Sequence, residues 1–389
     1  AAPTTSLPER IGGARNWDYR YAWLRDATFA LFALSVLGYS GEGRRFSEFL
    51  ARRCLREGSQ MRIMYSVDGE PFLPERTLDA LEGYHHSRPV RVGNAAAEQR
   101  QLDVFGEVLD WAELRAALGA RLTADEKGLL AGVADHVCAT WRVPDHGLWE
   151  MRTDPAEFVQ GKAMAWVTLD RAARLLGDRP AWERTRAAIL EAIRTEGTTG
   201  DPPALAQAFG SSETDAALLQ VPLLGLPLDE DLLARTVDRI EADLRAGDFV
   251  YRYRCDDGLA GEEGAFLITS FWLVEALLVT GRPERARALF ERLLAQANDV
   301  GLFSEEIDPA SGAFLGNFPQ AFTHLALVSA AALLHLHEIG GQRALAGTNT
   351  ARARRLVGAT EGLRALVFAL VRNRSVRLRP SRKSVLALT

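Results

Sequence analysis

Two kinds of predicted helix alternate along the chain, and this alternation constrains the fold more than any other sequence feature. One kind is apolar on almost every face, whereas the other has one charged and one apolar face. A helix that is apolar all round must be surrounded by protein, and a striped helix lies at the surface. Apolar helices are predicted at about 22–37, 95–117, 160–176, 212–224, 264–280 and 320–338, and striped helices at about 41–56, 123–142, 180–195, 229–245 and 284–298.

This alternation predicts an all-α fold with an inner ring of helices inside an outer ring, the (α/α)6 toroid. Glycines follow three of the apolar helices where a helix C-terminus favours them, at Gly38, Gly177 and Gly281. The outer ring lacks its first helix, which would precede Ala1. An open helical solenoid is the competing architecture, but no repeat of about 20–50 residues is found. Short hairpins or loops are expected at 58–75 and 247–255.

The predicted toroid occupies residues 1–340, and residues 341–389 form a basic tail. From Arg352 onward, arginines and one lysine face a single acid, Glu361. The stretch 361–373 predicts a short amphipathic helix, and the rest of the tail is expected to be partly disordered. A membrane or nucleic-acid contact is one interpretation of the tail, and a solvated appendage is the better one.

The composition argues against several classes of function. The net charge of −5 gives no general attraction to nucleic acid or to an anionic membrane, and no uncharged apolar run reaches the roughly 18 residues of a transmembrane helix. Cys54, Cys138 and Cys255 are widely separated, which is typical of small buried residues in a reducing compartment. The pairs His85–His86 and His335–His337 do not suit a metal site. We therefore expect a cytoplasmic protein with no cofactor, no metal, no nucleic-acid partner and no membrane contact.

The first chemically rich loop, residues 16–26, leads into the first apolar helix. It combines the aromatic residues Tyr19 and Trp23 with the charged residues Arg25 and Asp26. Aromatic rings can cover the apolar face of a sugar while Asp and Arg bind its hydroxyls. Taken alone, this loop is explained equally well by a buried Arg–Asp pair that orders the start of a helix.

Two further loops carry carboxylates. Glu150 follows Trp149, and an acid beside an indole suits the desolvated carboxyl of a general acid. Glu305, Glu306 and Asp308 lie on an apolar background, where three buried acids would repel one another, so at least one is expected to face solvent. Taken alone, these loops favour a Trp packed at a helix entry and a solvated acidic turn.

Longer motifs make the sequence resemble a known family. The segments NWDYRYAWLRDA, GYHHSRPVRVGNAAAEQRQLDVFGEVLD, GLWEMR, GEEGAFLITSFWLVEAL, ANDVGLFSEEIDP and GNFPQAFTHLALV are similar to the bacterial branch of glycoside hydrolase family 15. The similarity runs in order from about Ala2 to His337. That family includes glucoamylases, glucodextranases and trehalases, so the resemblance implies a toroid that acts on α-linked glucosides or trehalose.

The resemblance also implies roles for individual residues. Glu150 matches the general acid and Glu305 the general base, whereas Glu306 is a weaker candidate for the base. The Arg-Asp pair of the family binds the terminal glucose, and aromatic residues line the same subsite. The residues implied to bind the substrate are Tyr19, Trp23, Arg25, Asp26, Trp149 and Arg252.

The implied reaction is exo-acting hydrolysis of an α-glucosidic bond with inversion, which releases β-glucose. The linkage and the oligomeric state are left open by the sequence. The alternative is a truncated, inactive toroid that acts as a binding or structural protein, because a missing outer helix would leave apolar surface uncovered. Lyase or cyclase chemistry on the same fold is a weaker rival, since it would not need two separate acidic loops at one pocket.

Overall fold

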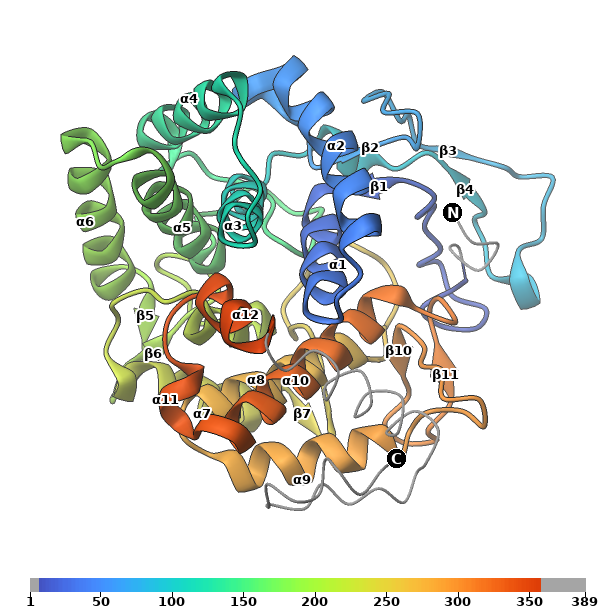
Figure 1. The fold of residues 1–389 in the computed structure, drawn as a ribbon. Coiled ribbons are helices and arrows are strands. Elements are labelled where there is room, and N and C mark those ends of the chain that lie inside the picture. The colour runs from blue at the N-terminus through green and yellow to red at the C-terminus, as the bar shows by residue number, and fades with distance from the viewer. Residues whose placement is uncertain (1–6, 358–389) are drawn as a thin grey trace.

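A computed structural model describes residues 7–357, without the side chains of several positions between 40 and 56. Six helices form a central ring (Figure 1). Each contacts the next in chain order, and the last packs against the first, so the ring closes. These inner helices are α1 (Leu24–Val36), α3 (Asp103–Ala117), α5 (Val159–Leu176), the 3-10 helix η4 (Ala216–Leu223), α8 (Leu267–Val279) and α10 (Ala321–Gly340).

Striped helices surround this ring, and the predicted toroid is confirmed. Helix α8 shows why the inner helices are apolar all round, because every residue of 267–278 is buried. The predicted capping box at Thr123 is also present and begins an outer helix. Within residues 7–357 the outer helices are α2 (Ser40–Glu57), α4 (Ala124–Thr140), α6 (Pro180–Thr195), α7 (Glu230–Leu244) and α9 (Pro283–Leu294).

Two inner segments differ from their predicted form. The segment 95–117 becomes an α-helix only at Asp103, because Gln99 and Arg100 bond to the neighbouring loop 146–151. The segment 212–224 contains a short 3-10 helix, η4, with Pro222 inside it. Proline lacks the N–H that a continuous α-helix would need at this position, which disfavours an α-helix over this segment.

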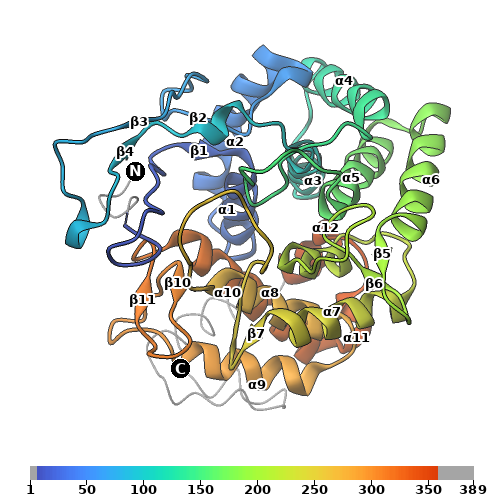
Figure 2. The ribbon, with the colours of Figure 1, turned by 180° about the vertical axis from the view of Figure 1, so that it is seen from behind.

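Very short antiparallel strands tie the loops together at one end of the ring (Figure 2). The predicted hairpin near 247–255 is confirmed by β7 (Arg245–Ala246) and β8 (Phe249–Val250). The sequence did not predict that this hairpin joins β9 (Ala265–Phe266), β10 (Glu306–Ile307) and β11 (Phe314–Leu315) in one five-stranded sheet. The sheet places the loops that precede α8 and α10 side by side.

The remaining strands form two-residue pairs. One of them links the start of α1 to the segment 58–75, which does not form a hairpin of its own. The pairs are β1 (Ala22–Trp23) with β2 (Met64–Tyr65), β3 (Arg76–Thr77) with β4 (Arg91–Val92), and β5 (Thr198–Thr199) with β6 (Ala204–Leu205), and single 3-10 turns occur at η1 (Gly58–Gln60), η2 (Tyr84–His86) and η3 (Ala95–Glu98).

Among the described residues, α10 is long and apolar enough to match the length and composition of a membrane span. The protein itself buries 61% of its most apolar window, however. This is the environment expected for an inner helix of the ring.

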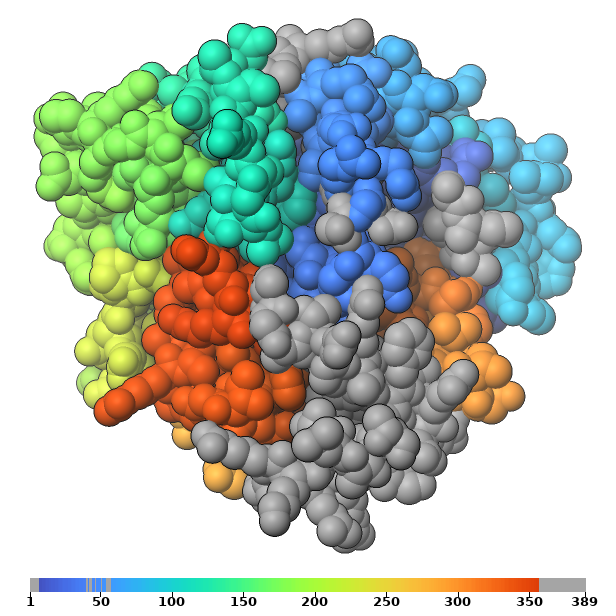
Figure 3. All heavy atoms as spheres, in the orientation of Figure 1, coloured from blue at the N-terminus to red at the C-terminus, as the bar shows by residue number. Residues whose placement is uncertain are grey.

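The packed part of the chain extends beyond the expected boundary at residue 340. After α10, the chain forms α11 (Gln342–Leu345) and α12 (Asn349–Val357), and α12 packs against α1, α3 and α10. Arg352 of α12 is buried and donates hydrogen bonds to the carbonyl oxygens of Leu345, Gly347 and Leu223. Residues 341–357 therefore belong to the body of the ring (Figure 3), while the helix predicted at 361–373 lies outside the described residues.

We predict that Arg352→Ala lowers the free energy of unfolding by about 2–4 kcal/mol, because it leaves buried carbonyl groups without donors. Arg354, two residues further along the same helix, is exposed and serves as the matched control. Urea unfolding of Arg354→Ala should change by less than about 0.5 kcal/mol. Equal effects of the two substitutions would show that α12 does not stabilise the ring.

Candidate active site

The loops that precede the inner helices gather at the end of the ring opposite α12 (Figure 2). Glu150 lies in the loop before α5. Its Oε1 atom accepts a hydrogen bond of 2.7 Å from the indole of Trp23 and lies 3.5 Å from the guanidinium of Arg25. The side chain is 17% exposed, so it is largely enclosed and still reachable. The sequence placed Trp23 and Arg25 in a glucose subsite, and the structure brings both of them to Glu150.

The backbone of Glu150 is held in an unusual conformation. Its φ of +61° is in the left-handed region, which costs a side-chain-bearing residue about 1–3 kcal/mol. In residues 7–357 only His85 and His86 share this feature among residues other than glycine. Gln99 donates hydrogen bonds to the carbonyl oxygens of Glu150 and Met151 and thereby supports this turn. Strain that the surroundings maintain in this way is typical of functional sites.

Arg25 and Asp26 extend the same side of the site. Arg25 is buried and donates to Gln101 and to the carbonyl oxygen of Leu148. Its guanidinium lies 3.5 Å from Asp26 and 3.7 Å from Asp103. Burial raises the pKa of Asp26 to about 6, although Arg25 opposes the shift. Asp26 Oδ2 has no hydrogen-bond partner among the described residues, so it is available to a ligand hydroxyl.

Glu305 is buried immediately before β10, and amide groups hold both of its oxygens. The backbone and side-chain N–H groups of Asn317 donate to Oε2, each at 2.9 Å. The side chain of Gln320 donates to Oε1 at 3.1 Å. Burial raises the pKa of Glu305, while the Asn317 backbone and the charge of Arg252 oppose the shift. The pairing of β10 with β11 brings these donors to the carboxyl group.

The next two acids of this loop have different surroundings. Glu306 is fully buried, where Oε2 accepts a hydrogen bond of 2.6 Å from the backbone N–H of Gly264. Burial, together with the charges of Glu9 and Glu263, raises its pKa well above the ordinary value. Asp308 faces solvent, which confirms that one acid of the three is exposed. The interpretation of the whole loop as a solvated turn is wrong, because β10 pairs with a strand on each side within the sheet.

Tyr19 lies near both candidate carboxylates. Burial raises the pKa of its phenol well above the ordinary value, and the charges of Glu305, Glu9 and Glu150 raise it further. Its ring packs against Trp23 with the centroids 5.5 Å apart. The charges of both Glu150 and Glu305 act on this phenol, so Tyr19 lies between the two loops in reach of each.

Trp149 is anchored rather than free. Its indole N–H donates to Asp215 at 2.7 Å, and its ring packs against Trp272 at 5.7 Å. Arg252 lies over the same ring at 5.6 Å and over Phe266 at 4.1 Å. The structure therefore places Trp149 and Arg252 together in the wall beside Glu150.

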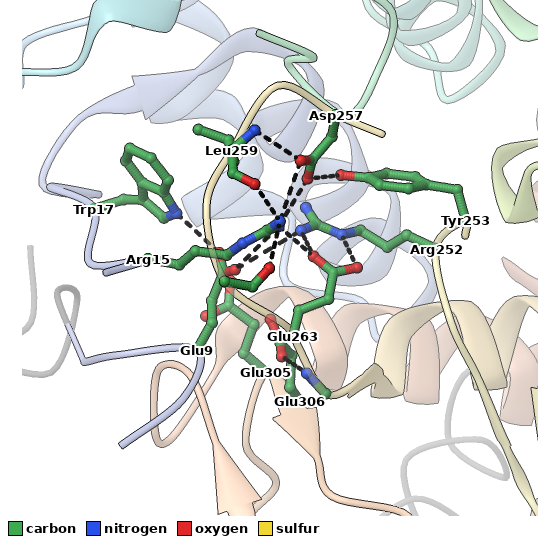
Figure 4. Close-up of polar contacts among 12 residues, drawn as sticks. Glu9, Arg15, Trp17, Arg252, Tyr253, Asp257, Leu259, Glu263, Glu305 and Glu306 are labelled. Carbon is green, nitrogen blue, oxygen red and sulfur yellow. Dashed lines mark hydrogen bonds and ion pairs between the residues drawn. The ribbon is translucent and has the colours of Figure 1, made fainter. Parts of the chain in front are cut away.

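Arg252 also belongs to an ion network that the sequence did not reveal (Figure 4). It pairs with Glu263, and Arg15 binds the same carboxylate at 3.0 Å. Arg15 also binds Asp257 through both of its terminal nitrogens, at 2.7 and 3.1 Å. Glu9 lies 3.9 Å from each arginine. In the sequence, Glu262 and Glu263 stand out as two acids directly before an apolar helix. Glu9, Arg15 and Asp257 lie in loops whose sequence has no distinctive pattern.

Three of these residues, Glu9, Arg252 and Asp257, line a small cavity. Within residues 7–357, no cluster of three or more His, Cys, Asp or Glu side chains is arranged to hold a metal ion. The lining includes carboxylates, aromatic rings and a guanidinium, a mixture suited to a polyhydroxylated ligand. Its members include Glu9, Trp17, Tyr19, Asn94, Glu150 and Arg252.

The fold and the site together define a helical toroid with a carboxylate-lined pocket at one end of its ring. The model of the family "Glycosyl hydrolases family 15" matches residues 1–332, and the chain belongs to this family. Solved structures agree on the fold. A wild-type glycosidase superposes with a TM-score of 0.66 at 18% identity and covers 86% of this chain and 92% of that one. A bacterial glucoamylase complexed with acarbose gives 0.65 at 14% identity, covering 92% and 54%.

Trehalases are among the relatives in sequence. The chain is 44% identical over 343 residues to a trehalase from Mycobacterium tuberculosis. It is 39% identical over 339 residues to a trehalase from Thermoplasma volcanium. Each alignment covers 85% of this chain but only 50% and 54% of the respective relative. The chain therefore spans about half the length of the trehalases that it matches.

The close approach of Gly316 to Glu305 leads to a prediction. A methyl group at Gly316, where φ is +65°, would lie 2.7 Å from Glu305 Oε2. Gly312 has a similar φ of +73° but open space around it, so it reports the backbone strain alone. We expect Gly312→Ala to cost about 1–2 kcal/mol of unfolding free energy and Gly316→Ala to cost about 1–3 kcal/mol more. Urea unfolding measures both, and equal costs would contradict a tightly packed Glu305.

Proposed function

We propose that this chain provides the catalytic toroid of an inverting, exo-acting α-glucoside hydrolase and that trehalose is its substrate. The observation that carries the proposal is a pair of carboxyls that are each fixed by hydrogen bonds from the protein, Glu150 and Glu305. The trehalases among its relatives support the choice of trehalose over other α-glucosides.

Glu150 acts as the general acid in this proposal and protonates the departing glycosidic oxygen. Glu305 acts as the general base and removes a proton from the attacking water on the opposite face of the sugar. An ionised carboxylate has about four acceptor sites. The donors from Asn317 and Gln320 use three of them. The remaining site can accept the proton of the water, so the same contacts that orient Glu305 leave it competent as a base.

Arg25 and Asp26 bind the terminal glucose in this proposal. Asp26 Oδ2 accepts no hydrogen bond among the described residues and lies 3.5 Å from the guanidinium of Arg25, which Gln101 and the carbonyl of Leu148 hold in place. A rigid guanidinium loses little entropy when it binds a second ligand. Recognition of the chain end at this position explains the exo-acting mode.

An inactive toroid that serves as a binding or structural protein is the alternative. The reason for this alternative was that the first inner helix has no outer helix preceding it in the sequence. The ring of inner helices nevertheless closes through the contact of α10 with α1, and four of the residues implied by the family motifs line one cavity, namely Tyr19, Trp149, Glu150 and Arg252. Both observations favour the enzyme.

The mechanism predicts that Glu150→Gln and Glu305→Gln each reduce kcat on trehalose by at least about 10³-fold, with melting temperatures within a few degrees of the parent. Proton NMR of the first product identifies the stereochemistry. Both anomeric carbons of trehalose are α, so inversion yields α- and β-glucose in equal amounts, whereas retention yields α-glucose alone. Near-normal turnover in either variant, or α-glucose alone, would exclude the assignment.

The pH profile gives an independent prediction. The base must be ionised, and burial raises the pKa of Glu305, so kcat/KM should fall on the acidic side along a limb that lies above pH 4.5. The charge of Arg252 opposes that shift. Arg252→Met should therefore move the limb to higher pH by about one unit.

Arg254 is the control for this experiment, because it is exposed and contacts the carbonyl oxygen of Asp243 and the ring of Tyr251, neither of which lines the cavity. Arg254→Met should leave the limb in place. A limb that stays at the same pH in Arg252→Met would show that Glu305 is not the group that titrates.

A further inference from the structure

The segment before α1 brings a third carboxyl, Glu9, into the pocket. This segment is tied to the loop that orients Glu305. The backbone N–H of Gly316 donates to the carbonyl oxygen of Pro8 at 2.9 Å, and the N–H of Leu7 donates to Asn317 at 3.0 Å. Asn317 is also a donor to Glu305, so Glu9 is positioned by the same loop as the proposed base.

Only one oxygen of Glu9 is satisfied by the protein. Oε1 accepts a hydrogen bond of 2.9 Å from the indole of Trp17. Oε2 has no hydrogen-bond partner among the described residues, and the guanidiniums of Arg15 and Arg252 are 3.9 Å away from it. The residue is 3% exposed. A buried oxygen without a partner costs about 1–3 kcal/mol, so a ligand that supplies the partner would recover this cost.

Glu9 lies near the proposed base Glu305 (Figure 4). It lines the same cavity as Glu150 and Tyr19, and its charge interacts with that of Glu305. In an inverting site, the acid and the base lie on either side of the anomeric carbon. A group that borders both of them therefore faces the part of the sugar next to that carbon, whereas Arg25 and Asp26 serve the terminal end.

The chemistry of Glu9 suits a sugar hydroxyl. Burial raises its pKa to about 8, with the charges of Glu263 and Glu305 adding to the shift and Arg252 opposing it. At neutral pH the group is therefore mostly a neutral carboxylic acid, which can donate as well as accept a hydrogen bond. A hydroxyl group has the same dual character, so the two groups can pair in either direction.

We propose that Glu9 is a substrate-binding residue whose free Oε2 oxygen binds the 2-hydroxyl of the glucose unit that is transferred to water. This inference rests on the proposed function, since it assigns a contact within that reaction. Hydrogen bonds to the 2-hydroxyl strengthen in the transition state of glycoside hydrolysis. Loss of the contact should therefore reduce kcat as well as raise KM.

The test compares α-glucosyl fluoride with its 2-deoxy analogue, because fluoride departs without a leaving-group sugar and isolates the contacts to the reacting glucose. Glu9→Ala should lower kcat/KM for the parent fluoride roughly 100-fold and for the 2-deoxy compound by less than about 3-fold. Glu9→Gln keeps the acceptor for Trp17 and a neutral group of the same shape, so it should retain at least about a tenth of the parent activity.

Glu262→Ala is the matched control, because Glu262 is exposed and pairs with Arg10 of the same segment. Both fluorides should react normally with it. If Glu9→Ala and Glu9→Gln each lose kcat/KM equally on the two fluorides, the proposal is overturned and Glu9 has a structural role only. A selective loss seen with the 6-deoxy compound instead would overturn the assignment to the 2-hydroxyl. Failure of the parent protein to hydrolyse either fluoride would contradict the proposed function itself.

Discussion

Two buried guanidinium groups, those of Arg15 and Arg252, make the candidate site possible. The carboxyls around them outnumber these cations, and burial of an uncompensated charge is costly. The negative charge is not shared equally among these carboxyls. Arg15 binds Asp257 and lowers its pKa against the effect of burial, while Glu9 and Glu306 have raised pKa values and can be neutral. The carboxyls that share this region are Glu9, Asp257, Glu263, Glu305 and Glu306.

A third buried arginine does the same for the other half of the pocket. Arg25 lies within 4 Å of Asp26, Asp103 and Glu150. A guanidinium stays charged at any pH that the fold tolerates, so the carboxylates of each half keep their compensating cation while they titrate. The acids need these buried cations because the apolar ring excludes the water that would otherwise solvate them.

The ring could be predicted from the sequence because periodicity reports burial directly. Trp23, Arg25 and Glu150 could be found because each stands in a short motif at the entrance of an apolar helix. The partners of Glu305 could not be found in this way. They are assembled by two-residue strands, which are too short to carry a period, and Glu9 reaches the site through backbone contacts of its segment. The sequence also placed the C-terminal boundary of the ring too early. The basic residues that suggested a tail include Arg352, which is buried.

One segment, residues 7–26, contacts the loops of both proposed catalytic carboxyls. Glu150 precedes α5 and Glu305 precedes α10, and these helices lie opposite each other in the order of the ring. Trp23 of the segment holds Glu150, while its first residues bond to the loop that holds Glu305. The distance between two carboxyls decides whether a water fits between the sugar and the base, and hence whether a glycosidase inverts or retains. Because one continuous stretch of chain contacts both carboxyl-bearing loops, its conformation contributes to that distance.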